Sequence, residues 1–124
     1  PQINNLGIRY AYDDDWVAEK ITDEILDKYP NLKGIYITGS GVLGVCKSLQ
    51  KANKIKDIKI IANDFINDNI QLLSNGTINF LIGQDAYTQG YQSIMLLFHK
   101  LFDNKNPDSK FAYTDIVIKN RFNI

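Results

Sequence analysis

The sequence predicts an α/β domain built on a parallel sheet, and three repeated units support this prediction. Each unit is a short run rich in β-branched residues that ends in a polar side chain and is followed by a helix-patterned segment; the runs are 35–38, 58–64 and 78–84. Repeated strand–turn–helix units form doubly wound parallel sheets of three layers. Ligands bind at the carboxyl ends of the strands in such sheets. We therefore expect the terminal Thr38, Asp64 and Gln84 to lie on one rim.

Two patterns predict the first strand and the first helix: large hydrophobic side chains at every second position, and a run of acidic residues. Alternating side chains predict a strand over 7–12, and the acidic run 13–15 follows it. Acidic side chains favour a helix start, because they accept hydrogen bonds from free N–H groups and complement the helix dipole. Apolar residues repeat every four positions from Val17 to Ile25, which predicts an amphipathic helix that stops at Pro30.

The later elements alternate in the same way. After the strand over 35–38, we expect helices over 42–49, 67–74 and 86–103, and strands over 58–62, 77–83 and 113–119. The helix over 86–103 is apolar around well over half of its circumference, and such a helix is buried on more than one side. It indicates either a second lobe or partner subunit, or the deep core of a compact domain.

Composition limits the possible functions. The 124 residues form at most one domain, with 44% hydrophobic residues and 14 basic residues against 14 acidic ones. No basic cluster supports direct binding of nucleic acid, and no apolar run approaches the roughly 20 residues of a membrane span. A single cysteine, Cys46, and a single histidine, His99, argue against a zinc site, so we predict no metal and no cofactor. Cys46 is expected to be a small buried hydrophobe.

Nucleophilic catalysis has little support in this sequence. His99 lies among apolar residues in the middle of a predicted helix, where a structural role is expected. The triplet Gly39-Ser40-Gly41 is not a nucleophile elbow, because the Gly-x-Ser-x-Gly spacing is absent. We therefore predict that the protein is not an enzyme.

Two alternatives use the same loops. The run 39–44 has the G-x-G-x-x-G spacing after a strand, with Asp64 twenty residues further on, which is typical of a dinucleotide site. The acidic run 13–15 with Asp64 also suggests a phospho-accepting receiver domain, with Lys119 at its last strand. Gln84 stands where a receiver needs a hydroxyl, and the acidic run is explained equally well as a helix cap.

A sugar site is the remaining interpretation. Asp64 and Gln84 offer a carboxylate and an amide, which satisfy neighbouring hydroxyls in complementary ways, and Thr38 ends the preceding strand. Trp16 and Phe65 provide aromatic faces for a sugar ring. Alternatively, these residues are ordinary turn and cap residues, which favour the same positions.

Three segments resemble the LacI/GalR transcription regulators and the related periplasmic sugar-binding proteins. The run 27–49, with Ile-Tyr-Ile-Thr-Gly-Ser-Gly-Val-Leu-Gly at its centre, is similar to their "aifaandgmAlGal" stretch. The run 58–64 resembles their "isvvgfDd" strand, and 78–91 resembles "ltti-Q-p-y-emG". Order and spacing agree from about Gly7 to the end, and the phrases 36–47 and 83–92 look most like the regulator branch.

This resemblance implies a function as well as a fold. Residues 1–124 would be one domain, the C-terminal lobe of a two-lobed effector domain whose N-terminal lobe and DNA-binding headpiece lie upstream. Asp64 and Gln84 match ligand-binding positions, Thr38 stands where the family usually has Asn, and Ser40, Trp16 and Phe65 complete the candidate set. The implied protein is a cytoplasmic, homodimeric regulator that senses a sugar-like effector without a cofactor. A periplasmic or lipid-anchored sugar-binding protein of a transporter or sensor is the alternative.

Overall fold

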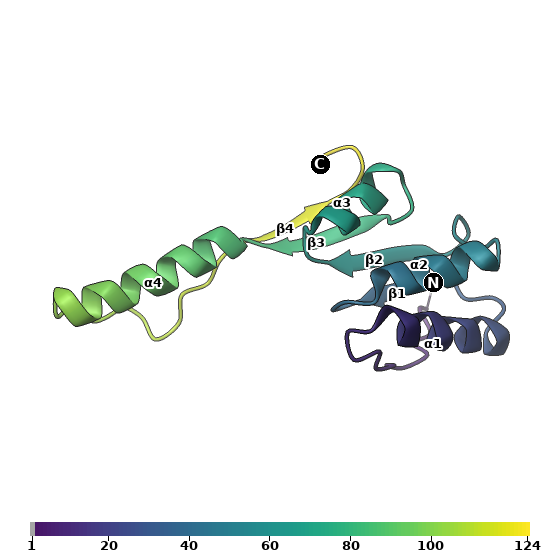
Figure 1. Ribbon diagram of the computed structural model, residues 1–124, viewed down its shortest axis with the longest axis horizontal. Helices are drawn as coiled ribbons and strands as arrows, with labels where there is room; N and C mark the ends of the chain where they lie inside the picture. Colours follow the sequence, from purple (N-terminus) through teal and green to yellow (C-terminus); the bar gives the residue numbers. More distant parts are fainter. Residues whose placement is uncertain (1) are drawn as a thin grey trace.

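The computed structural model describes residues 2–124 as four strands and four helices (Figure 1). In chain order they are α1 (Asp15–Lys28), β1 (Gly34–Ile37), α2 (Val42–Lys51), β2 (Lys59–Asn63), α3 (Asn67–Ser74), β3 (Phe80–Gln84), α4 (Ala86–Phe102) and β4 (Ile116–Lys119). The α/β class is confirmed, and α3 has the bounds that the sequence predicts.

The sheet is mixed, with the strand order β1-β2-β3-β4. The first three strands are parallel, as expected from the repeated units. The last strand runs antiparallel to β3, with Gln84 opposite Ile116 and Leu81 opposite Lys119. The expectation of an all-parallel sheet is therefore wrong for β4, because β4 returns alongside the strand that the chain has just left and needs no crossover.

The predicted strand over 7–12 is also wrong. These residues are irregular, and β1 pairs with β2 alone among the described strands. Gly7 and Tyr12 have positive φ values of 89° and 52°, which are incompatible with an extended strand. Alternating side chains do not make a strand unless a neighbouring strand pairs with the backbone, and residues 7–12 have no such partner strand within 2–124.

The core lies on one face of the sheet. Ile37, Ile60 and Leu81 occupy alternate strand positions and form one cluster with Leu49 of α2 and Leu73 of α3. Tyr36 and Phe80 point to the opposite face and are 55% and 42% exposed. The described chain therefore forms two layers where the sequence predicted three.

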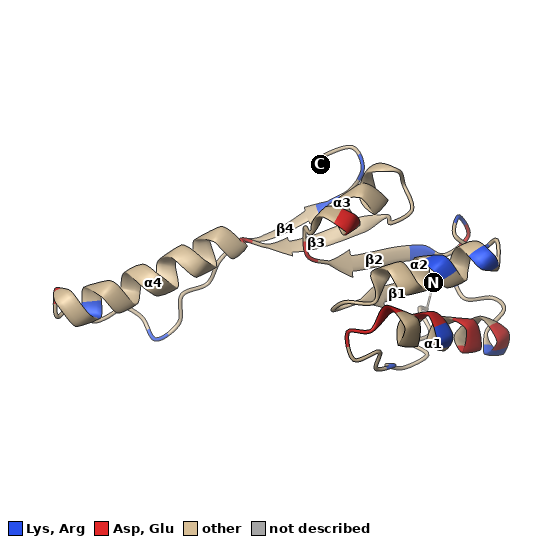
Figure 2. Cartoon of the chain, in the orientation of Figure 1, with Lys and Arg blue, Asp and Glu red and all other residues tan. Residues whose placement is uncertain are grey.

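The last helix stands apart from this core. No residue of α4 is buried, and the helix projects away from the sheet while 103–115 runs back beside it to β4 (Figure 1). Of the two alternatives for this helix, the deep core of a compact domain is therefore wrong. Figure 2 shows that charged residues are frequent on α1 and α2, whereas most of α4 has none. No helix of residues 2–124 is both long and apolar enough to cross a membrane.

Candidate ligand-binding site

The strands end in polar residues on one rim, as the sequence predicts. Thr38 follows β1 directly, Asp64 follows β2, and Gln84 is the last residue of β3. All three are exposed. The amide of Asp64 donates to the carbonyl of Ile82 at 2.9 Å, which ties the ends of β2 and β3 together.

Asn63 connects two of these strand ends, although the sequence analysis did not select it. Its Nδ2 donates to the Thr38 carbonyl at 3.1 Å, and its Oδ1 accepts from the Tyr36 hydroxyl at 3.2 Å. Strand alternation could have identified it, because Asn63 and Ile61 share the face that lacks a helix layer. The side chain braces β1 against β2 at the rim.

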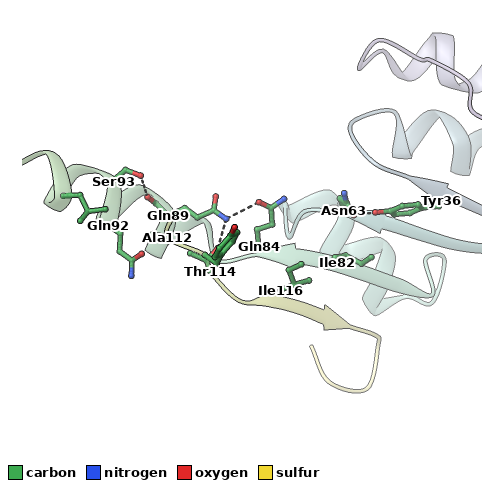
Figure 3. A pocket seen from close by; sticks show the side chains of 12 residues that line it. Tyr36, Asn63, Ile82, Gln84, Gln89, Gln92, Ser93, Ala112, Thr114 and Ile116 are labelled. Carbon is green, nitrogen blue, oxygen red and sulfur yellow. Dashed lines mark hydrogen bonds between the residues drawn. The ribbon is translucent and has the colours of Figure 1, made fainter. Parts of the chain in front are cut away.

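A groove lies beside Gln84, between the exposed sheet face and the first half of α4 (Figure 3). Its volume is about 590 Å³, which is in the range of small-molecule pockets. Every lining side chain is uncharged; they are Tyr36, Asn63, Ile82, Gln84, Gln89, Gln92, Ser93, Leu96, Ala112, Tyr113, Thr114 and Ile116. A neutral lining of amides, hydroxyls and aromatic rings suits a polar ligand without charge.

At the mouth of this groove, Gln89 of α4 links the end of β3 to the segment that precedes β4. Its Nε2 donates to Gln84 Oε1 at 3.1 Å and to Thr114 Oγ1 at 2.9 Å. Asp85 caps α4 by accepting from the amide of Thr88 at 2.9 Å, and hydrogen bonds from Thr88 hold the pKa of this carboxyl below its usual value. The junction between β3 and α4 is therefore ordered by side chains that the sequence analysis did not select.

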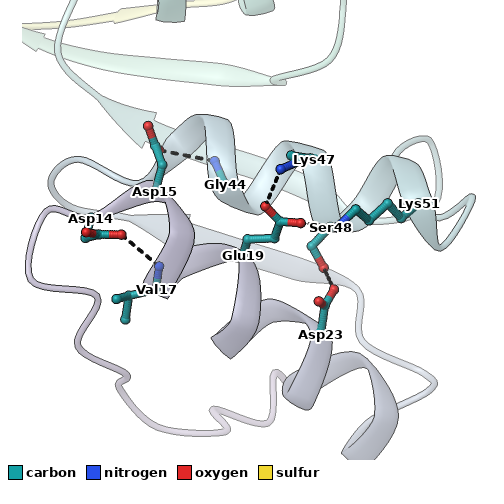
Figure 4. A network of polar contacts seen from close by, with 9 residues as sticks. All are labelled: Asp14, Asp15, Val17, Glu19, Asp23, Gly44, Lys47, Ser48 and Lys51. Atoms are coloured by element: carbon teal, nitrogen blue, oxygen red, sulfur yellow. Dashed lines mark hydrogen bonds and ion pairs between the residues drawn. The ribbon is translucent and has the colours of Figure 1, made fainter.

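The acidic run does not form a pocket. Asp14 Oδ1 accepts from Val17 N at 2.9 Å as the N-cap of α1, which confirms the predicted helix cap (Figure 4). Asp15 Oδ1 accepts from Gly44 N at 3.1 Å (Figure 4), and Asp13 Oδ1 accepts from Ser40 N at 3.0 Å. Because all three carboxylates accept hydrogen bonds from backbone amides, the acidic run gives no support to a receiver domain.

The dinucleotide alternative also loses its basis. The amides of Ser40 and Gly44, which would have to face a phosphate, already donate to Asp13 and Asp15. A carboxylate in this position repels a pyrophosphate. The glycines serve packing instead, since a Cβ on Gly44 would lie 1.8 Å from the carbonyl oxygen of Asp15.

The two aromatic candidates lie apart from the groove. Trp16 is 62% exposed on α1, where the ammonium of Lys20 lies 3.5 Å from the ring centre. Phe65 covers Gly83, whose Cβ would come within 2.1 Å of the ring, and so it contacts the core side of the sheet. Of the predicted set, only Gln84 lines the groove. The carbonyl of Thr38 accepts from the lining residue Asn63, Asp64 follows Asn63 in the chain, and Ser40 lies beyond Thr38.

The remaining reactive side chains have structural settings. Cys46 is 2% exposed, and burial raises the pKa of its thiol to about 11, so it is the small buried hydrophobe that the sequence predicts. His99 lies on the surface of α4, with Nδ1 2.6 Å from Asp103 Oδ2. Within residues 2–124, no group of His, Cys, Asp and Glu side chains is arranged to hold a metal ion.

Comparison with known proteins identifies the family. Residues 1–105 match the family described as the periplasmic binding protein domain, and the chain belongs to this family. No curated protein matches the chain.

Solved sugar-binding proteins share the fold. A solute-binding protein of an ABC transporter from Agrobacterium vitis, with bound D-fucose, superposes with a TM-score of 0.85 at 24% identity over 95% of this chain and 40% of its own. The arabinose-binding protein AraP from Geobacillus stearothermophilus gives 0.80 at 25% identity, over 95% of this chain and 43% of its own. A D-allose-bound solute-binding protein from Actinobacillus succinogenes superposes with a TM-score of 0.82 at 21% identity, over 91% of this chain and 39% of its own. The chain thus spans about 40% of the length of these structures.

Proposed function

We propose that this chain is one lobe of a sugar-binding protein that delivers its ligand to a transporter or a sensor, and that it performs no catalysis. The observation that carries the proposal is the rim itself: Asp64 and Gln84 end adjacent strands beside an uncharged groove. A carboxylate accepts from one sugar hydroxyl, while an amide donates to a neighbouring oxygen. Family membership and the sugar-binding structural neighbours support the same class of ligand.

A second lobe is part of this proposal. Two-lobed binding proteins close on their ligand by a hinge motion. The chain leaves the sheet after β3 and returns at β4, and everything between lies outside the core. We infer that α4 docks on the other lobe and that 85 and 115 border the hinge, with the groove facing the cleft between the lobes.

The regulator remains a second candidate, and its support is the resemblance of the segments 36–47 and 83–92 to the regulator branch. It would place the protein in the cytoplasm as a homodimer, with DNA bound by an upstream headpiece. The coding sequence upstream of Pro1 separates the two candidates. A helix-turn-helix segment favours the regulator, whereas a signal peptide or lipobox favours the transport or sensor protein.

The site is tested by calorimetric titration of the full-length protein. The probes are D-fucose, L-arabinose, D-allose, D-glucose and D-galactose, and we expect at least one to bind. Asp64→Ala removes a charged acceptor and should weaken binding by about 2 kcal/mol or more, which is about 30-fold. Asp57→Ala is the matched control, because it removes an exposed carboxylate just before the other end of β2. Equal affinity of Asp64→Ala and the wild type would contradict the assignment.

A further inference from the structure

The backbone of Asp64 has an unusual conformation at the point where the candidate site needs its carboxylate. Its φ is 70°, in the left-handed region that residues other than glycine rarely adopt. Within residues 2–124 the hydrogen bonds of Asp64 involve its backbone alone, and the residue is exposed, so its carboxylate is available to a ligand. A strained conformation of this kind persists only where its surroundings hold it.

The side chain that holds it comes from α3. Asn69 Nδ2 donates to the carbonyl of Asn63 at 2.9 Å and to the carbonyl of Asp64 at 3.1 Å. Asn69 is only 3% exposed, so these two bonds are shielded from water. The amide of Asp64 is meanwhile bound to the Ile82 carbonyl. Both sides of the Asp64 residue are therefore anchored, one to β3 and one to α3.

A short neutral amide suits this position. The two N–H groups of one amide nitrogen can serve two carbonyls at once. A carboxylate at residue 69 would face both carbonyl oxygens without a proton to donate, and an alanine would leave both carbonyls without the amide. Asn69 also lies in the first turn of α3, so its amide reaches back over the turn that follows β2.

We propose that Asn69 is a positioning residue of the candidate site: its amide fixes the left-handed backbone of Asp64 and thereby directs the carboxylate towards the ligand. The geometric part stands on the contacts of Asn69 alone, and the ligand part rests on the proposed function. Asn69 itself does not touch the ligand.

The geometric part is tested by NMR of the full chain without ligand. The three-bond HN–Hα coupling and the Cα and Cβ shifts of Asp64 report its backbone conformation. Asn69→Ala should move them from left-handed towards extended values, while the signals of Ile60 and Ala62 in β2 stay in place. Asn69→Ser keeps one donor and should give an intermediate shift, and it carries the test if Asn69→Ala does not fold. Left-handed values of Asp64 retained in both variants would overturn the proposal.

The ligand part is tested by titration with whichever of the five sugars binds the wild type most tightly. Asn69→Ala should weaken binding at least tenfold. Asn75→Ala is the matched control, because Asn75 accepts from Thr77 N at 3.0 Å at the far end of α3. We expect it to lower stability and leave affinity unchanged. If Asn69→Ala lowers stability alone, the positioning role is wrong. If none of the sugars binds the wild type, the proposed function fails, and the NMR result still decides the role of Asn69.

Discussion

Consecutive aspartates at 13–15 show what a sequence does and does not reveal about single residues. The cap formed by Asp14 is predictable, because it acts within three residues of its own position. Asp13 accepts from the amide of Ser40 and Asp15 from that of Gly44, and these bonds join segments almost thirty residues apart. No local pattern encodes such partners, and for this reason the acidic run could also suggest a receiver pocket.

Gly44 should tolerate no side chain. A Cβ there would overlap the Asp15 carbonyl oxygen at 1.8 Å, and α1 would have to move away from α2. Overpacking of this kind costs about 1–3 kcal/mol, so Gly44→Ala should lower the urea midpoint of unfolding clearly. Gly90→Ala is the control, because a Cβ at Gly90 would meet nothing within 4 Å. Gly90 lies inside α4, where alanine favours the helix more than glycine does. Gly90→Ala should be neutral or stabilising by up to about 1 kcal/mol. Equal midpoints for Gly44→Ala and the wild type would show that the two helices do not pack as described.

At the scale of elements, α1 and α2 are joined by a polar clamp. Glu19 is 7% exposed and pairs with Lys47 at 2.8 Å and with Lys51, and Asp23 accepts from Ser48 (Figure 4). Hydrogen bonds from Lys47 and Lys51 hold the pKa of Glu19 below its ordinary value of 4.5. The charged form of Glu19 is therefore the one that stabilises the helix pair.

This clamp predicts a pH dependence. A carboxyl whose pKa is lowered on folding stabilises the protein fully above its unfolded pKa, and the stabilisation is lost as the pH falls through the folded pKa. The free energy of unfolding should therefore decline below about pH 4.5, and Glu19→Gln should flatten that decline while lowering stability at pH 7. Urea titrations between pH 3 and pH 7 measure both effects. Glu24→Gln on the same helix is the control, since Glu24 forms no ion pair among the described residues. An unaltered slope in Glu19→Gln would contradict the clamp.

Element prediction succeeded where a segment carries its own signals. The end of α3 follows from the local stop signal Asn75-Gly76, and the three parallel strands follow from β-branched runs. The strand over 7–12 and the direction of β4 did not, because pairing depends on which backbone lies alongside. The polar ends of β2 and β3 were predictable from one residue each, whereas Asn63, Gln89 and Asn69 act through partners from other elements.

On the scale of the whole molecule, the sequence showed that α4 is apolar around most of its circumference. It did not show that the helix projects away from the sheet (Figure 1). Ile94, Leu97 and Leu101 are 69%, 59% and 68% exposed on a helix that projects from the sheet. Side chains of this kind on one helix form an apolar patch that favours association. The chain alone is therefore expected to self-associate through α4.

Leu101→Lys tests this expectation. A charge in the patch should shift the chain towards the monomer, because a buried lysine without a partner destabilises an interface. Light scattering after size exclusion, over a range of concentrations, measures the change. Ser109→Lys adds the same charge at an exposed polar position of the following loop and should leave the oligomer in place. A monomeric wild-type chain at all concentrations would remove the role of α4 in association.

The antiparallel pairing of β3 with β4 also makes the lobe separable. Gln84 and Ile116 face each other across the ladder, so residues 85–115 are topologically an insertion into the loop of a β-hairpin. Replacing 85–115 with Asn-Gly should close that hairpin with a two-residue turn of the favoured twist. We expect the shortened protein to keep the cooperative unfolding of the core around Leu49 and Leu81, as circular dichroism would record, and to be monomeric. Such a minimal lobe would keep the polar strand ends and lose seven of the twelve residues that line the groove. The contribution of the strand ends to ligand binding could then be measured separately from that of the groove.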